Sequence, residues 1–150
     1  MIENVVLTVG NSLMGDDGAG ALLARLLHEA PLERWGIVNG GSVPENCLHQ
    51  LRALAPNLVL VVDTADMDLP SGTVRLLAQE SLENPFMFST HTLPLTFLIE
   101  SLKEFIPTVM FLGIQPEVVS FGYPMSEAVK RAVSEVYAGL KRGALDWEVL

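Results

Sequence analysis

Residues 9–20 of the chain, VGNSLMGDDGAG, form the stretch from which the fold can be inferred. They follow an apolar, β-branched run at residues 5–9 that is typical of a buried strand, and they precede a helical pattern that begins near Asp17. Four glycines within the stretch permit tight turning of the backbone. The stretch is therefore predicted to be a strand-to-helix loop at the carboxyl edge of a sheet, where open α/β folds place their ligands.

The acidic pair Asp16 and Asp17 limits what this loop can bind. A phosphate-binding loop would need a lysine and a hydroxyl residue, and a dinucleotide loop would need the order Gly-x-Gly-x-x-Gly; neither pattern is present. Two carboxylates repel phosphate and attract a cation, so the pair predicts a metal or proton-transfer site. The simpler interpretation is that Asp16 caps the helix and Asp17 is a favourable charge in its first turn.

Length and composition favour one compact domain, residues 1–150, with 49% hydrophobic residues. A net charge of -9 disfavours nucleic acid as a partner and favours a cation or a basic peptide. Because no apolar run approaches the roughly 20 residues that span a bilayer, and no signal peptide is evident, we expect a cytoplasmic protein. The lone Cys47 leaves any metal in an environment of oxygen and imidazole ligands.

Strand and helix patterns alternate along the rest of the chain. Further strands are predicted at residues 35–38, 58–62, 73–77 and 109–114, and helices at 22–30, 44–55, 94–102 and 126–141. The order predicts an α/β fold, a three-layer α/β/α sandwich around a mainly parallel five-stranded sheet. Whether one edge strand runs antiparallel is left open.

Polar side chains follow the first three predicted strands. Parallel strands end at the same edge of a sheet, so Asp17, Asn39 and Asp63 are expected to lie close together. With His91, which lies just before a predicted helix, Asp17 and Asp63 would offer two oxygens and one imidazole to a divalent metal such as nickel or zinc. Alternatively, Asp63 caps a turn and His91 is an ordinary loop residue.

Four motifs occur in order along nearly the whole chain. They are GNSLMGDDGAG at residues 10–20, VVDTAD at 61–66, STH at 89–91 followed by Pro94-Leu95, and FLGIQP at 111–116. Together they resemble the hydrogenase maturation endopeptidases, most closely the branch that serves the hydrogenase of formate hydrogenlyase complexes. The resemblance implies an aspartyl-type endopeptidase that removes a C-terminal extension from the nickel-iron hydrogenase large-subunit precursor after nickel insertion.

The resemblance also implies roles for individual residues. Asp17, Asp63 and His91 match the metal ligands of the family and are the predicted catalytic residues, with Asp16 as a neighbour that assists proton transfer. The nickel would be carried by the precursor, so the resting enzyme need hold no metal, and we expect a monomer. Many relatives have Asp where this chain has Asn39, whose amide cannot act as a general base but can donate a hydrogen bond to an oxyanion.

Two other functions stay open at this stage. A receiver domain phosphorylated on Asp63 would use the acidic pair to hold magnesium, although the pair lies well beyond the first strand and no lysine follows Ile114. A maturation factor that binds nickel without cleaving a peptide bond is the second alternative.

Overall fold

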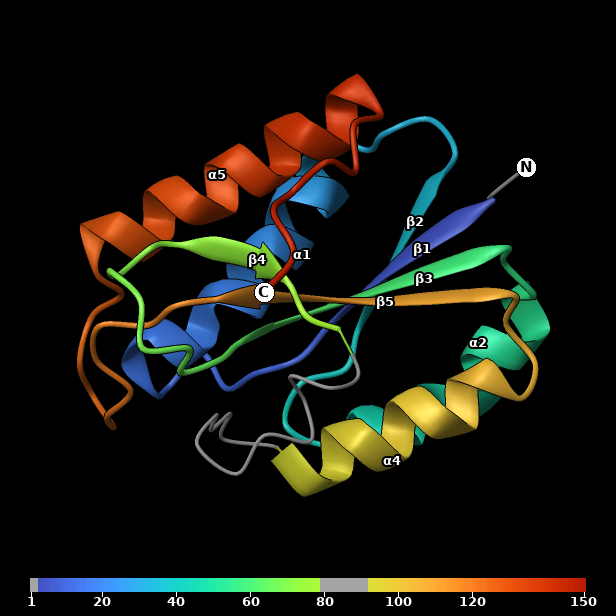
Figure 1. Ribbon diagram of the computed structural model, residues 1–150, viewed down its shortest axis with the longest axis horizontal. Coiled ribbons are helices and arrows are strands. Elements are labelled where there is room, and N and C mark those ends of the chain that lie inside the picture. Colours follow the sequence, from blue (N-terminus) through green and yellow to red (C-terminus); the bar gives the residue numbers. More distant parts are fainter. Residues whose placement is uncertain (1–2, 79–91) are drawn as a thin grey trace.

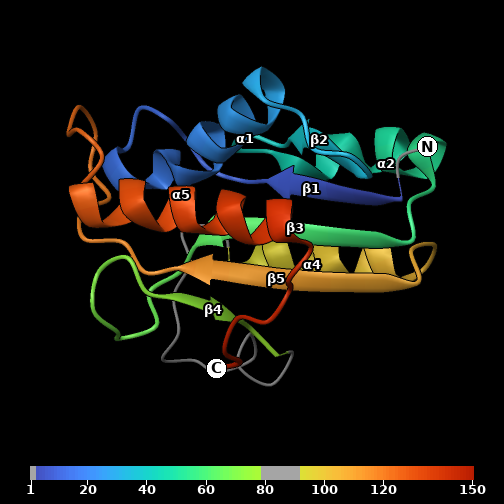
Figure 2. The same cartoon turned by 90° about the horizontal axis from the view of Figure 1, so that it is seen from above.

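The computed structural model describes residues 3–78 and 92–150, and in these ranges a single sheet contains five strands. The strands are β1 (Asn4–Thr8), β2 (Trp35–Asn39), β3 (Leu58–Thr64), β4 (Val74–Leu76) and β5 (Thr108–Ile114). Their order across the sheet is β2-β1-β3-β5-β4, and all neighbours are parallel except β4 and β5. Figure 2 shows β4 running against its neighbour at one edge. The predicted mainly parallel five-stranded sheet is confirmed, and the structure resolves the open question of strand direction, since the edge strand β4 is antiparallel to β5.

Helices cover both faces of this sheet, as the three-layer prediction requires. The helices are α1 (Ala19–Glu29), α2 (Leu48–Leu54), α4 (Thr92–Lys103) and α5 (Glu127–Arg142). In Figure 1, α1 and α5 lie on one face of the sheet, and α2 and α4 lie on the other. No helix in the described ranges is long and apolar enough to cross a membrane.

The side chains of β3 explain why both faces need helices. Successive residues of a strand point to opposite faces, so a strand without polar alternation is apolar on both sides. Val59 and Val61 belong to the core that contains α2 and α4, whereas Leu60 and Val62 belong to the core that contains α1 and α5. All four side chains are buried, and β3 is therefore the centre of the molecule.

The start of α1 differs from the prediction. Residues Gly15–Gly18 form a 3-10 turn, and the α-helix begins only at Ala19, after Gly18 at the N-cap. The N-cap of the 3-10 turn is Met14, and neither Met14 nor Gly18 makes a side-chain capping bond. The interpretation of Asp16 as a helix cap is therefore wrong. The physical reason is that the Asp16 carboxylate binds a distant segment instead, as described below.

Strand β3 also extends further than its apolar run. It continues to Thr64, so that Asp63 pairs with Gly113 of β5 and lies within the strand rather than after it. At the sheet edge, β4 is shorter than predicted, and its outer side pairs with the last residues of the chain. Leu76 donates from its N to Glu148 O at 2.8 Å, and Leu150 N donates to Leu76 O at 2.9 Å.

Candidate active site

Two glycines bring the loop after β1 into close contact with the rest of the carboxyl edge. Gly10 has a φ of +140°, and a Cβ there would overlap the carbonyl oxygen of Asp17. Gly15 has a φ of +60°, and a Cβ there would lie 2.7 Å from the carbonyl oxygen of Val118. Side chains at these positions would meet fixed backbone in an unfavourable conformation, so the loop needs glycine to fold in this way.

Asp17 is attached to the end of β3. Its side chain is buried, Oδ2 accepts a hydrogen bond from Asn11 N at 2.9 Å, and Oδ1 accepts one from Thr64 Oγ1 at 3.1 Å. Thr64 follows Asp63 directly in β3. Both predicted carboxylate residues therefore lie at the carboxyl edge, with Thr64 as the link between them.

Asp63 is also buried, and its Oδ1 accepts a hydrogen bond from Thr64 N at 2.8 Å. By the alternation of the strand, its side chain faces the same side as Val59 and Val61, the side of α2 and α4. Helix α4 begins there at Thr92. The third predicted ligand, His91, precedes that residue and lies outside the described residues.

Asp16 turns away from Asp17 and binds the connection between β5 and α5. Its Oδ2 accepts from Glu117 N at 2.8 Å, Val118 N at 3.0 Å and Ser126 Oγ at 2.9 Å. Its Oδ1 accepts from Ser126 N at 2.6 Å. We call these four hydrogen bonds the Asp16 clamp. Ser126, which the sequence analysis missed, is also the N-cap of α5.

Asn39 lies at the end of β2, exposed beside the same edge. Its Oδ1 accepts from Gly41 N at 3.1 Å and from Thr8 Oγ1 at 3.4 Å. Gly10 N donates to Gly41 O at 2.9 Å, so the loops after β1 and β2 are joined. These bonds use the side-chain oxygen as an acceptor and fix the orientation of the amide, whose nitrogen is the group that can donate to a substrate.

Gln115 is a second residue whose role the sequence analysis missed. Its buried Oε1 accepts from Met67 N at 2.6 Å and from Leu69 N at 3.4 Å. Its Nε2 donates to Asp66 Oδ1 at 3.1 Å. The amide thereby fixes the loop that follows Asp63. The available signal was a polar residue directly after the apolar strand in the FLGIQP motif.

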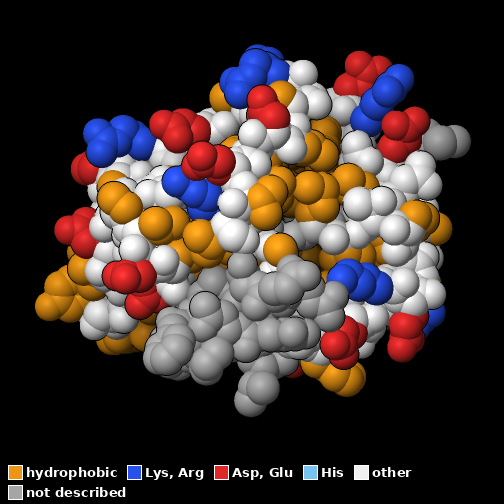
Figure 3. Space-filling model, in the orientation of Figure 1, with side chains coloured by type: hydrophobic (Ala, Val, Ile, Leu, Met, Phe, Trp, Pro, Cys, Tyr) orange, Lys and Arg blue, Asp and Glu red, His pale blue; other side chains and the backbone are white. Residues whose placement is uncertain are grey.

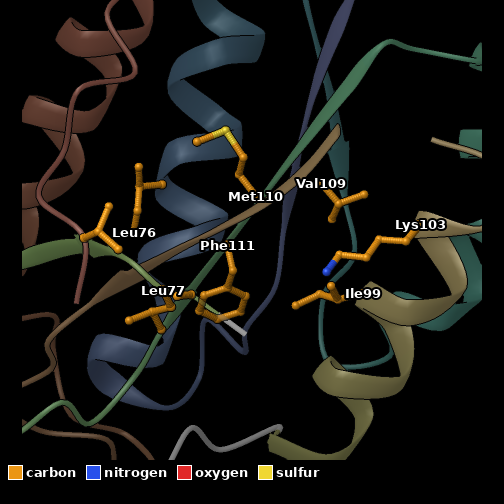
Figure 4. A pocket seen from close by; sticks show the side chains of 9 residues that line it. Leu76, Leu77, Ile99, Lys103, Val109, Met110 and Phe111 are labelled. Atoms are coloured by element: carbon orange, nitrogen blue, oxygen red, sulfur yellow. The ribbon is translucent and has the colours of Figure 1, made fainter. Parts of the chain in front are cut away.

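A cavity of about 280 Å³ lies away from these acidic residues, between β5 and α4 (Figure 4). Its floor is formed by residues of β5, and Ile99 and Lys103 of α4 line one side. The described residues that line it include no carboxylate, imidazole or thiol, so its chemistry does not suit a metal ion. Elsewhere in residues 3–78 and 92–150, no three acidic, histidine or cysteine side chains form a metal-binding group. This range excludes His91.

The family model described as HycI, hydrogenase maturation protease, matches residues 21–141. The chain belongs to the hydrogenase maturation protease family. It is 48% identical to the hydrogenase 3 maturation protease of Escherichia coli K12 over 140 residues, which are 93% of this chain and 90% of the relative. Hydrogenase maturation proteases are peptide hydrolases that process the hydrogenase large-subunit precursor, and this chain is an enzyme of that kind.

Solved structures of maturation proteases share the fold. The solution structure of the endopeptidase HycI from Escherichia coli superposes with a TM-score of 0.91 at 45% identity, covering 100% of this chain and 97% of that one. A [NiFe] hydrogenase maturation protease from Thermococcus kodakarensis gives 0.79 at 26% identity, covering 93% and 91%. The resemblance inferred from the four motifs is thus confirmed. The chain is a protease, which decides against the two alternative functions, a receiver domain and a non-catalytic nickel-binding factor.

Proposed function

We propose that this protease removes the C-terminal extension of a nickel-iron hydrogenase large-subunit precursor after nickel insertion, using Asp17, Asp63 and His91 to receive the nickel. The observation that carries the proposal is the buried Asp17 carboxylate, hydrogen-bonded to the residue that follows Asp63. The β1–α1 loop and the end of strand β3 thus each contribute one carboxylate to the same edge of the sheet. This edge is where parallel α/β folds place their ligands.

The donor set suits the proposed substrate. Carboxylate oxygens and an imidazole nitrogen are acceptable ligands for Ni²⁺, and three protein ligands leave positions for the precursor's own ligands and for water. The nickel is cargo of the precursor and is not resident in the enzyme. Nickel recognition would fix the scissile peptide beside Asp17 and Asp63. A polarised water would then add to its carbonyl carbon and lose a proton, and the C–N bond would break as a proton passes to the leaving amine nitrogen.

Two neighbouring residues receive supporting roles. The amide nitrogen of Asn39 is proposed to donate a hydrogen bond to the oxyanion that forms on the scissile carbonyl. Asp16 is proposed to position the loop that bears Asp17, because the four described hydrogen bonds that its carboxylate accepts come from the β5–α5 connection. The proton-transfer role predicted for Asp16 from the sequence is untested.

The setting of the enzyme is part of the proposal. We propose that residues 1–150 act as one protease domain, that the protein is a cytoplasmic monomer, and that it binds the precursor without contacting nucleic acid or inserting into a membrane. The net charge of -9 supports the absence of nucleic acid among its partners.

The deciding experiment measures the intact mass of the precursor after incubation with the enzyme. Nickel-loaded precursor should lose one C-terminal fragment, and nickel-free precursor should lose none. His91→Ala should abolish the loss, whereas His28→Ala, which changes an exposed histidine of α1, should not. Equal cleavage with and without nickel, or an active His91→Ala variant, would contradict the proposed metal recognition.

A further inference from the structure

Three large apolar side chains are exposed on two loops that are hydrogen-bonded to each other at the carboxyl edge. Leu13 in the loop after β1 is 62% exposed, and Phe121 and Tyr123 in the β5–α5 connection are 73% and 59% exposed. Gly122 N donates to Leu13 O at 3.0 Å, so the backbone between the two aromatic residues is joined to the backbone of Leu13. We call these three side chains the rim patch. Figure 3 shows hydrophobic side chains gathered at the end of the molecule where, in Figure 1, the β5–α5 connection projects.

Hydrogen bonds fix the backbone that carries the rim patch. The Asp16 clamp holds both ends of the connection, at Glu117, Val118 and Ser126. Between these ends, Tyr123 N donates to Ser120 O at 3.3 Å. Apolar side chains on an ordered backbone lose little conformational entropy when a partner covers them. The rim patch therefore has the properties of a preformed docking surface.

The rim patch is continuous with the proposed active site. Leu13 belongs to the same loop as Asp17, and Asp16 joins that loop to the connection that carries Phe121. A molecule bound across the patch would lie beside the carboxylates at the end of β3.

We infer that the rim patch docks the large-subunit precursor and places its C-terminal segment at the carboxylates, an inference that rests on the proposed function. The proposed substrate is itself a protein, and protein surfaces carry apolar side chains beyond the scissile peptide. Exposed Phe, Tyr and Leu side chains suit such a surface, because aromatic residues are enriched in protein interfaces and dominate their affinity.

A second copy of this chain fits the rim patch less well. Two copies each carry a net charge of -9 and repel one another.

The test compares two sets of alanine substitutions at exposed apolar residues. The patch variant combines Leu13→Ala, Phe121→Ala and Tyr123→Ala. The control combines Leu54→Ala on α2 and Phe97→Ala on α4, residues that are 38% and 65% exposed and lie on helices that cover the other face of the sheet. Circular dichroism verifies that both proteins are folded. The single substitution Phe121→Lys provides a second patch variant, in which only one exposed side chain is changed.

Cleavage kinetics on the nickel-loaded precursor should separate docking from chemistry. We expect KM to rise at least about tenfold for the patch variant and kcat to stay within about twofold, with both constants unchanged for the control. Precursor binding in the Asp17→Asn background, measured by calorimetry, should weaken by the same factor. A patch variant and a Phe121→Lys variant that bind and cleave like the wild type would overturn the inference.

The remaining outcomes distinguish this inference from the proposed function. If the wild type binds precursor through the patch but does not cleave it, the proposed function fails while the docking surface stands. Sedimentation that shows a wild-type dimer and a monomeric patch variant, with unchanged precursor binding, would assign the patch to a second copy and overturn the inference.

Discussion

The β1–α1 loop carries two neighbouring aspartates, Asp16 and Asp17, whose carboxylates bind different parts of the molecule. On one side, Asp16 accepts four hydrogen bonds from the β5–α5 connection; on the other, Asp17 accepts one from its own loop and one from Thr64 of β3. Both carboxylates are buried, so burial does not separate them. What differs is the number of fixed donors, and this difference indicates that Asp16 stabilises the edge on which we propose that Asp17 acts.

The largest expected effect is that of Asp17→Asn on cleavage. The amide keeps the size of the side chain but loses the charge that we propose receives the nickel of the precursor. We expect the single-turnover rate on nickel-loaded precursor to fall about 100-fold or more, measured by intact mass. A rate within a few fold of the wild type would remove Asp17 from the active site.

Asp16→Asn should affect stability more than chemistry. The new NH2 group would face backbone N–H donors that now bind a carboxylate oxygen, and the free energy of unfolding should fall by about 3 kcal/mol in urea denaturation. Cleavage per folded molecule should fall far less than in Asp17→Asn. Unchanged stability combined with lost cleavage would instead support the proton-transfer role.

Gln115→Ala extends the comparison to the loop after Asp63. The substitution removes the acceptor for Met67 N and Leu69 N, which should lower the free energy of unfolding by about 2 kcal/mol and speed hydrogen exchange at these amides. Gln50→Ala, at an exposed position of α2, is the matched control and should change neither quantity. Unaltered exchange at Met67 would show that other contacts fix the loop.

The smallest effect is expected from Ser126→Ala. It removes one donor of the Asp16 clamp and the N-cap of α5, at an expected cost of about 1 kcal/mol in thermal or chemical unfolding. Ser134→Ala, at an exposed position within the same helix, should not lower stability, because alanine has the higher helix propensity. Equal effects of the two substitutions would argue against a capping role.

Periodic patterns account for the parts of the fold that the sequence predicted well. The apolar run at residues 58–62 has no polar alternation, and the strand it forms is covered on both faces. The apolar stripe of α5 is an equally direct signal of its structure, since Val129, Val133 and Val136 recur at helical spacing and are all buried. These patterns are local, so a single sequence is enough to detect them.

The roles of Asp16, Ser126 and Gln115 were missed because their partners are distant in the chain. Asp16 lies 110 residues from Ser126, and Gln115 lies 48 residues from Met67. The local sequence around Asp16 favours a helix cap, and a tertiary contact overrides that preference. The parallel strand order predicted the placement of Asp17 and Asp63 at one edge, but it carried no information about which of the neighbouring residues stabilise that edge.

The Asp16 clamp also has a consequence for biosynthesis. Its two halves come from the first and last parts of the chain, and contacts of such long sequence separation close late because the chain entropy of the intervening loop must be overcome first. During translation, Asp17 is synthesised well before Ser126. We therefore expect hydrolytic competence to appear only after α5 has left the ribosome and docked, so that unfinished chains do not cut peptides.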